Sequence, residues 1–163
     1  MRTFLLTCLP LLAAAATRRP LLGANQPCWD KTKELDALAA NNGGVLPPGG
    51  ERPTCDRLGR FSPKQCSGSQ CYCVDPQGEQ LEYTQNRWEA DIMQCRCARE
   101  EHEIAEAGQL GSSVKCDVQG NYHHTQCRGS SCYCVHPATG EAREGTEAHV
   151  GEFSALEEKC SSL

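Results

Sequence analysis

Apolar residues recur at helical spacing in two stretches of the chain, each just after a cysteine. In the first stretch, Leu35, Leu38 and Ala39 form one apolar stripe along a helix. Asp30 is placed to cap this helix and Gly43 to end it. The pattern predicts an amphipathic helix at the start of this half of the chain.

The second stretch repeats the arrangement with more charge. Cys97 and Ile104 are seven residues apart, as are Cys28 and Leu35, so cysteine and aliphatic residue share a helix face in both stretches. Glu100, Glu101 and Glu103 are expected in the first turn, where the helix dipole favours carboxylates. A second helix is therefore predicted, ending near residue 108.

Short strands are predicted after each helix. Residues 71–74 form a strand candidate, and the turn at 75–78 leads into a second strand through Thr84. Residues 56–59 and 117–120 are typical turns, with Phe61 and Tyr122 following as core candidates. Cys71 and Cys73 point to the same side of a strand, which leaves them poorly placed to bond each other.

The N-terminus has the pattern of an export signal. Met1 and Arg2 give a positive start, and Phe4–Ala16 is a 13-residue apolar run that ends in small residues. The run is too short to span a bilayer comfortably. We expect residues 1–16 to be a signal peptide, followed by an N-terminal segment at 17–27, and the protein to be secreted into the extracellular space.

Twelve of the 13 cysteines form two sets of six with the same inner spacing. The second to fifth cysteines of each set are separated by 10, 4 and 1 residues, and residues 55–76 match residues 116–137 at 12 of 22 positions. The remaining cysteine, Cys8, falls in the predicted signal. The chain is thus expected to contain two disulfide-stapled modules, at 28–95 and 97–160, because modules this small bury too little apolar surface to be stable otherwise.

Charge and composition exclude several functions. Residues 28–95 carry 10 acidic and 7 basic side chains and residues 97–160 carry 11 and 5, with no basic cluster, which argues against nucleic acid or membrane as partner. Overlapping C-x4-C and C-x-C spacings in an oxidising compartment disfavour zinc. With no spare thiol and no nucleophile or cofactor motif, we expect neither an enzyme nor a protein with a cofactor or metal.

All five histidines lie in the second module, and two interpretations of them remain open. They are ordinary solvated surface residues, or they let this module lose negative charge in an acidic compartment. The five histidines are His102, His123, His124, His136 and His149.

The cysteine framework resembles the thyroglobulin type-1 module. That family has a helix at its first cysteine, then Cys-x-x-x-Gly-x-[Phe/Tyr], Gln-Cys, Cys-[Trp/Tyr]-Cys-Val, a Gly turn and a final cysteine. In this chain these motifs are residues 55–61, 65–66, 71–74, 78 and 95, and then 116–122, 126–127, 132–135, 140 and 160.

The resemblance implies a small disulfide-rich α+β fold in two tandem thyroglobulin type-1 modules. Each module would have an N-terminal helix, short antiparallel strands, loops and three disulfides. Six cysteines alone allow 15 pairings, but the family pairs them in sequence. The implied bonds are Cys28–Cys55, Cys66–Cys71, Cys73–Cys95, Cys97–Cys116, Cys127–Cys132 and Cys134–Cys160.

The family includes thyropins, which inhibit papain-like cysteine proteases of the cathepsin type by non-covalent insertion of three loops into the active-site cleft. Carried onto module one, the loops contain Val45, Leu46, Pro47, Pro48, Gly49 and Gly50, then Ser67, Gly68, Ser69 and Gln70, then Gln85, Asn86 and Arg87. Prolines anchored near Cys55 would make loop one a rigid apolar tip; the alternative is that its prolines and glycines mark an ordinary turn-rich surface loop. The second loop holds four residues where the family usually has about six, and loop one of module two (107–115) lacks the prolines.

A secreted, monomeric inhibitor of papain-like cysteine proteases is therefore the first functional hypothesis. The alternative is a non-inhibitory extracellular module that binds another protein or acts as a scaffold, since one fold carries many functions.

Overall fold

The computed structural model describes residues 25–109 and 111–163. The predicted signal peptide at 1–16 and most of the 17–27 segment lie outside these residues. In the described part of the chain, no helix is both long enough and apolar enough to cross a bilayer.

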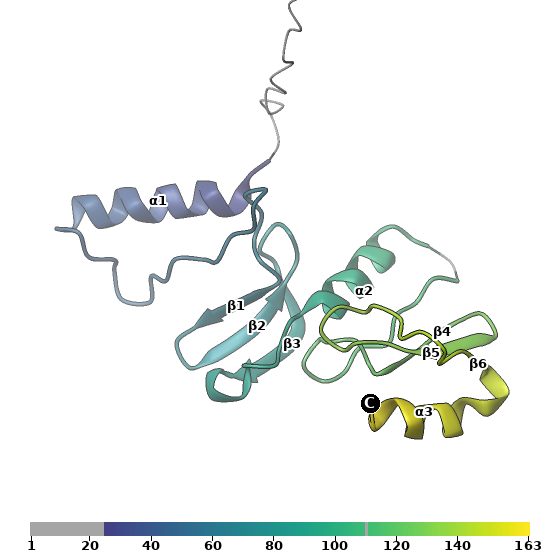
Figure 1. Ribbon diagram of the computed structural model, residues 1–163. Helices are drawn as coiled ribbons and strands as arrows, with labels where there is room; N and C mark the ends of the chain where they lie inside the picture. The colour runs from purple at the N-terminus through teal and green to yellow at the C-terminus, as the bar shows by residue number, and fades with distance from the viewer. Residues whose placement is uncertain (1–24, 110) are drawn as a thin grey trace, which may run out of the picture.

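Module one has one helix and one sheet (Figure 1). Helix α1 (Pro27–Asn41) is followed by strands β1 (Lys64–Ser67), β2 (Gln70–Val74) and β3 (Gln80–Asn86), and then by the 3-10 turn η1 (Arg87–Glu89). The strands form an antiparallel sheet in the order β1-β2-β3. The sheet is larger than the sequence indicated, because β1 had no clear pattern and β3 continues past Thr84 to Asn86.

Module two repeats this plan and adds a second helix. Helix α2 (Arg96–Glu106) precedes strands β4 (Thr125–Arg128), β5 (Ser131–Cys134) and β6 (Ala148–His149), which form an antiparallel sheet in that order. The turn η2 (Val150–Glu152) leads into helix α3 (Phe153–Ser161). Helix α3 was not expected from the sequence. It buries Leu156 and Cys160 against the sheet, and the α+β architecture of two tandem modules is confirmed.

Six disulfides hold the two modules. Cys71 and Cys73 share a face of β2 but bond to different partners, Cys66 across the β1–β2 hairpin and Cys95 beyond the sheet. None of these six disulfides, which include every cysteine of the described residues, joins one module to the other. The six pairs are the same as those that the family resemblance implies. They are Cys28–Cys55, Cys66–Cys71, Cys73–Cys95, Cys97–Cys116, Cys127–Cys132 and Cys134–Cys160.

Both helices begin earlier than expected, which changes the role of their acidic residues. Helix α1 starts at Pro27, a residue favoured at the first helical position, so Asp30 lies inside its first turn and is not the cap. Leu38 is 45% exposed and does not belong to the buried face formed by Leu35 and Ala39. Helix α2 starts at Arg96, so its glutamates lie beyond the first turn.

Module two docks directly onto module one. Helix α2 packs against β2 and β3, and Ala98 joins the core cluster of module one beside Cys73 and Met93. Three polar contacts cross the same boundary: Gln94 N donates to Asn121 Oδ1 at 2.7 Å, Tyr83 Oη donates to Glu101 at 2.7 Å, and Gln85 Nε2 donates to the Val118 carbonyl at 3.3 Å.

Arg99 makes the densest set of contacts between the modules. Its guanidinium donates to the carbonyl oxygens of Val74, Phe61 and Asp75 in module one, at 2.7–3.0 Å. Burial lowers the pKa of Arg99, but an arginine stays charged in proteins. With only Arg96 between Cys95 and Cys97, these contacts make a stiff tandem rather than two modules on a flexible tether.

Candidate functional site

The first candidate loop of module one contains a tight turn at its tip. Gly50 N donates to the Pro47 carbonyl at 2.9 Å, and Gly49 between them has φ +82°. This is the geometry of a type II turn, in which Pro48 supplies the fixed φ and Gly49 the positive one. Val45, before the turn, is 64% exposed. The tip is therefore apolar and has a defined backbone.

The start of this loop is fixed to the end of helix α1. Gly44 N donates to the Ala39 carbonyl at 2.7 Å, with Gly43 in the left-handed conformation, as expected for a helix end at this glycine. Asn42 Nδ2 donates to the Val45 carbonyl at 3.1 Å. The loop therefore leaves the helix in one direction, which Figure 1 shows as the segment running back below α1.

The second candidate loop, Ser67–Gln70, is the hairpin turn between β1 and β2. All four of its residues are exposed. Ser67 pairs with Gln70, and the disulfide Cys66–Cys71 closes the hairpin immediately behind them. A loop of this length has little freedom to change shape, so the turn is held rigid by its own disulfide.

The third candidate loop is joined to the second by backbone hydrogen bonding. Asn86 pairs with Gln70 in the sheet, and Arg87 N donates to the Ser69 carbonyl at 2.8 Å. Gln85, which the family pattern placed in this loop, donates its side-chain amide across the module boundary to Val118. Of the three residues, Asn86 and Arg87 lie beside the second loop, whereas Gln85 faces module two.

Glu51, the residue after Gly50, connects the first loop to the other two. One carboxylate oxygen accepts from Gly68 N at 3.4 Å, and the other lies 3.6 Å from the Arg87 guanidinium. We call the surface formed by residues 45–51, 67–70 and 86–87 the loop edge. Sequence reasoning missed Glu51, because nothing local shows that its partners are 17 and 36 residues further along the chain.

Module two builds a similar hairpin but not the same edge. Val150 N donates to the Ser130 carbonyl at 2.8 Å, as Arg87 N does to Ser69 in module one. The position that matches Glu51 is Ser112, counted back from the second cysteine of each module, so this module has no carboxylate there. The two modules therefore present different chemistry at matching positions.

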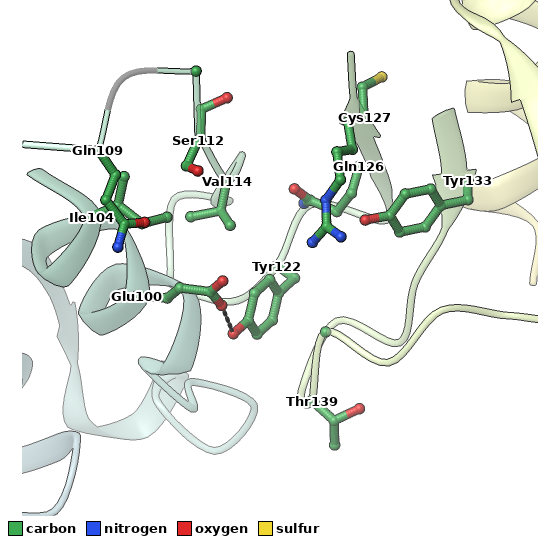
Figure 2. Close-up of a pocket in the computed structure, with 14 residues that line it drawn as sticks. Glu100, Ile104, Gln109, Ser112, Val114, Tyr122, Gln126, Cys127, Tyr133 and Thr139 are labelled. Carbon is green, nitrogen blue, oxygen red and sulfur yellow. Dashed lines mark hydrogen bonds between the residues drawn. The ribbon is translucent and has the colours of Figure 1, made fainter. Parts of the chain in front are cut away.

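A hollow of about 560 Å³ lies beside helix α2 in module two, between that helix and the β4–β5 hairpin (Figure 2). Ile104 and Val114 line it together with the rings of Tyr122 and Tyr133. Tyr122 Oη donates to the carboxylate of Glu100, and burial together with this bond raises the pKa of Tyr122 well above its ordinary value. The Glu100 carboxylate in this hollow is therefore already hydrogen-bonded to a neighbouring side chain.

Two of the five histidines are not ordinary surface residues. The rings of His123 and His124 are half-buried with centroids 4.1 Å apart, and His123 Nε2 lies 3.6 Å from Glu157 of helix α3. Burial, then the neighbouring His124 and Lys115, lower the pKa of His123. This corrects the interpretation of all five histidines as solvated surface.

These two histidines and Glu157 place potential metal-ligand atoms within 4.8 Å of one another. Two contacts oppose a cation there. Lys115 Nζ lies 3.5 Å from the Glu157 carboxylate, and His123 Nδ1 accepts from Thr125 N at 3.4 Å, which puts the proton of the neutral ring on Nε2. The arrangement is therefore a Lys115–Glu157 ion pair with the neutral His123 ring beside the carboxylate.

Comparison with known proteins defines the family. The model of the thyroglobulin type-1 repeat matches residues 31–95 and again 95–155. The chain belongs to this family, with two repeats in tandem, and the resemblance seen in the cysteine framework is confirmed.

Its relatives include much longer proteins. Thyroglobulin of Mus musculus is 30% identical over 114 residues, which cover 66% of this chain and 4% of thyroglobulin. Equistatin of Actinia equina is 32% identical over 150 residues, 81% of this chain and 62% of equistatin. The H-2 class II histocompatibility antigen gamma chain of Rattus norvegicus is 45% identical over 42 residues, 24% of this chain and 15% of that protein. The chain thus spans less than two thirds of each of these relatives.

Proposed function

We propose that the protein is a secreted inhibitor of papain-like cysteine proteases of the cathepsin type, and that it acts by inserting the loop edge of module one into the active-site cleft. The observation that carries the proposal is the convergence of three separate loops on one edge. Glu51 bonds to the second loop and pairs with the third, and the second and third loops share the Ser69–Arg87 hydrogen bond.

The edge suits a steric block because its shape is set before binding. A disulfide, a type II turn and short backbone hydrogen bonds fix the loops, so little conformational entropy is lost when they enter a cleft. Turn-rich backbone is also a poor fit to the extended conformation that a protease must bind in order to cut. All twelve cysteines from residue 28 to 160 are in disulfides, so the described part of the chain offers no thiol to the target, and the block would be non-covalent.

Module one is the better candidate of the two. Its edge has an exposed valine, two consecutive prolines and the Glu51–Arg87 pair, whereas module two has Ser112 at the matching position. An apolar tip flanked by charge suits a protease cleft, where apolar subsites alternate with polar backbone.

The test is an inhibition panel with the purified, oxidised full chain against papain and cathepsins L, S and B. The proposal expects reversible inhibition below micromolar concentration of at least one of them. The same chain after reduction and alkylation is the control and should be inactive, since the edge depends on the disulfides. If no protease in the panel is inhibited at micromolar concentration, the proposal fails.

The alternative is an extracellular protein-binding or scaffolding module without inhibitory activity. The short second loop favours it, because a hairpin of four residues makes a narrower wedge than the family's usual loop. An inactive panel together with an unchanged fold would support this second function.

A further inference from the structure

One tryptophan lies exposed beside the loop edge. Trp88 is 70% exposed, against 39% for Trp29, the other tryptophan of the chain. Ile92, four residues later, is 66% exposed. Tryptophan side chains are highly buried on average, and tryptophan is enriched among the residues that dominate binding at protein interfaces.

The backbone that carries Trp88 is firmly held. It is the middle residue of η1, where Asn86 Nδ2 donates to Glu89 at 3.1 Å. Ala90, the residue after η1, is buried, and its carbonyl accepts a hydrogen bond from Lys64 Nζ at 3.0 Å. An indole on such a turn needs little ordering when it binds, which is the main cost of using a large side chain as an anchor.

The position of Trp88 is tied to the loop edge and is specific to module one. Trp88 follows Arg87, whose amide bonds to Ser69 in the second loop. The residue that makes this bond in module two is Val150, and the one after it is Gly151. The only aromatic anchor at this place in either module is therefore Trp88, within the described residues.

The surroundings indicate what kind of partner fits. Glu89 and Asp91 are exposed and alternate with the two apolar residues along residues 88–92. Exposed acidic side chains thus stand next to exposed apolar ones along this segment, and protein interfaces likewise combine apolar anchors with polar residues around them. Residues 87–92 carry two carboxylates and one arginine, a net charge of −1 that disfavours an anionic membrane surface.

We propose that Trp88, supported by Ile92, is a binding anchor that packs on the apolar surface of the target protease beside the cleft, and that it gives module one its specificity. This inference rests on the proposed function and adds a contact outside the three loops. A loop edge alone is narrow, and the indole widens the contact on the side of the third loop.

The test compares three variants of the oxidised full chain in the inhibition panel. Trp88→Ala should raise the inhibition constant about 30-fold, as expected for a hot-spot residue, and Trp88→Phe should retain most of the potency. Leu58→Ala is the matched control and should change it less than about twofold. Leu58 is 63% exposed but lies in the turn that packs under the start of helix α1, where Gly59 O accepts from Cys28 N. Equal melting temperatures would show that all three variants are folded.

A second experiment detects contact between Trp88 and the protease without measuring inhibition. In the Trp29→Phe variant, Trp88 is the only tryptophan, so 5-fluorotryptophan labels it alone for ¹⁹F NMR. Adding an unlabelled, covalently inactivated protease should shift and broaden its signal.

The outcomes distinguish failure of the Trp88 anchor from failure of the proposed inhibitory function. If the wild type inhibits and Trp88→Ala inhibits equally well, the anchor is disproved while the inhibitor remains. If the wild type inhibits nothing, both are disproved. Binding of Trp88 to anionic vesicles, or self-association that Trp88→Ala abolishes, with protease inhibition unchanged, would assign the tryptophan to another partner and overturn the inference.

Discussion

Gly120 lies where the backbone of module two approaches Cys73 of the Cys73–Cys95 disulfide in module one. Its φ is +73°, and a Cβ there would lie 2.8 Å from Cys73 Sγ and 3.0 Å from the Ala98 Cβ. The cysteine repeat predicted a turn glycine at this position, and its conformation confirms that. The close approach to Cys73 depends on the docking of two modules, which no local pattern contains.

Gly129 provides a matched comparison for a mutation at Gly120. Gly129→Ala places a Cβ in open space at φ +59° and should cost about 1 kcal/mol of stability from backbone strain. Gly120→Ala should cost about 2–3 kcal/mol more, because overpacking is added to the same strain. Denaturant unfolding of the oxidised proteins measures the difference. Equal losses for the two variants would mean that the modules do not meet at Gly120.

His123 gives module two a pH-dependent stability. Its pKa is lowered in the folded protein, chiefly by burial, so the unfolded chain binds a proton first as the pH falls. The stability is complete above the ordinary pKa of histidine, about 6.5, and is lost as the pH falls through the lower folded value. Melting temperatures between pH 7.5 and 5 should therefore decline on the acidic side.

Replacing His123 by Asn should flatten this decline. The asparagine oxygen can still accept from Thr125 N, but the side chain does not titrate. His149→Asn is the control, since His149 Nδ1 makes a similar bond to Gly151 N at 3.1 Å in an exposed position. An identical pH profile for His123→Asn and the wild type would contradict the role of His123.

The helices and strands could be predicted from the sequence where the residues that determine them are close together in the chain. Helix α1 and the β2 strand were predicted because apolar spacing and the Cys-x-Cys motif are read within a few residues. The starts of the helices were misplaced, because α1 begins at Pro27, before the expected cap Asp30, and α2 begins at Arg96, a full turn before the glutamates expected in its first turn. Helix α3 was missed because its burial of Leu156 depends on β5, which is about 20 residues away.

The turn at the tip of loop one is the element on which the proposed wedge depends. Replacing Leu46 and Pro47 together by glycine removes the apolar surface and loosens the turn, while Cys28–Cys55 still forms behind it. We expect inhibition to weaken at least tenfold from lost contact and added chain entropy. Disulfide mass mapping confirms that the framework is intact.

The control for this pair is a double glycine substitution in the matching loop of module two, at Ser112 and Ser113. It should leave the inhibition constant unchanged if module one alone binds. Unchanged potency of the Leu46/Pro47 variant would place the wedge elsewhere.

At the scale of the whole molecule, the contacts of Arg99 with carbonyl oxygens of module one indicate that the two modules form one stiff unit. Arg99→Met keeps a similar length and removes all of these hydrogen bonds. It should cost about 2 kcal/mol, from charged hydrogen bonds that are lost and carbonyls left unpaired. It should also widen the range of module orientations in small-angle scattering.

Arg96→Met is the matched control, since Arg96 is exposed in the same segment and joins the modules without docking them. It should change neither stability nor scattering. An Arg99→Met protein with wild-type scattering would show that the linker alone, with its single residue between two disulfide-bonded cysteines, fixes the orientation.

The sequence by itself determined the family, the two-module organisation and the position of the turns, because disulfide spacing and turn chemistry act over short stretches of chain. It named most of the loop edge but placed Gln85 there, although this side chain turns to module two. Only the tertiary structure decided that Glu51 joins the loops, that Arg99 locks the modules and that Trp88 stays exposed. Each of these depends on which distant segments come together, and that is settled by packing and not by any local pattern.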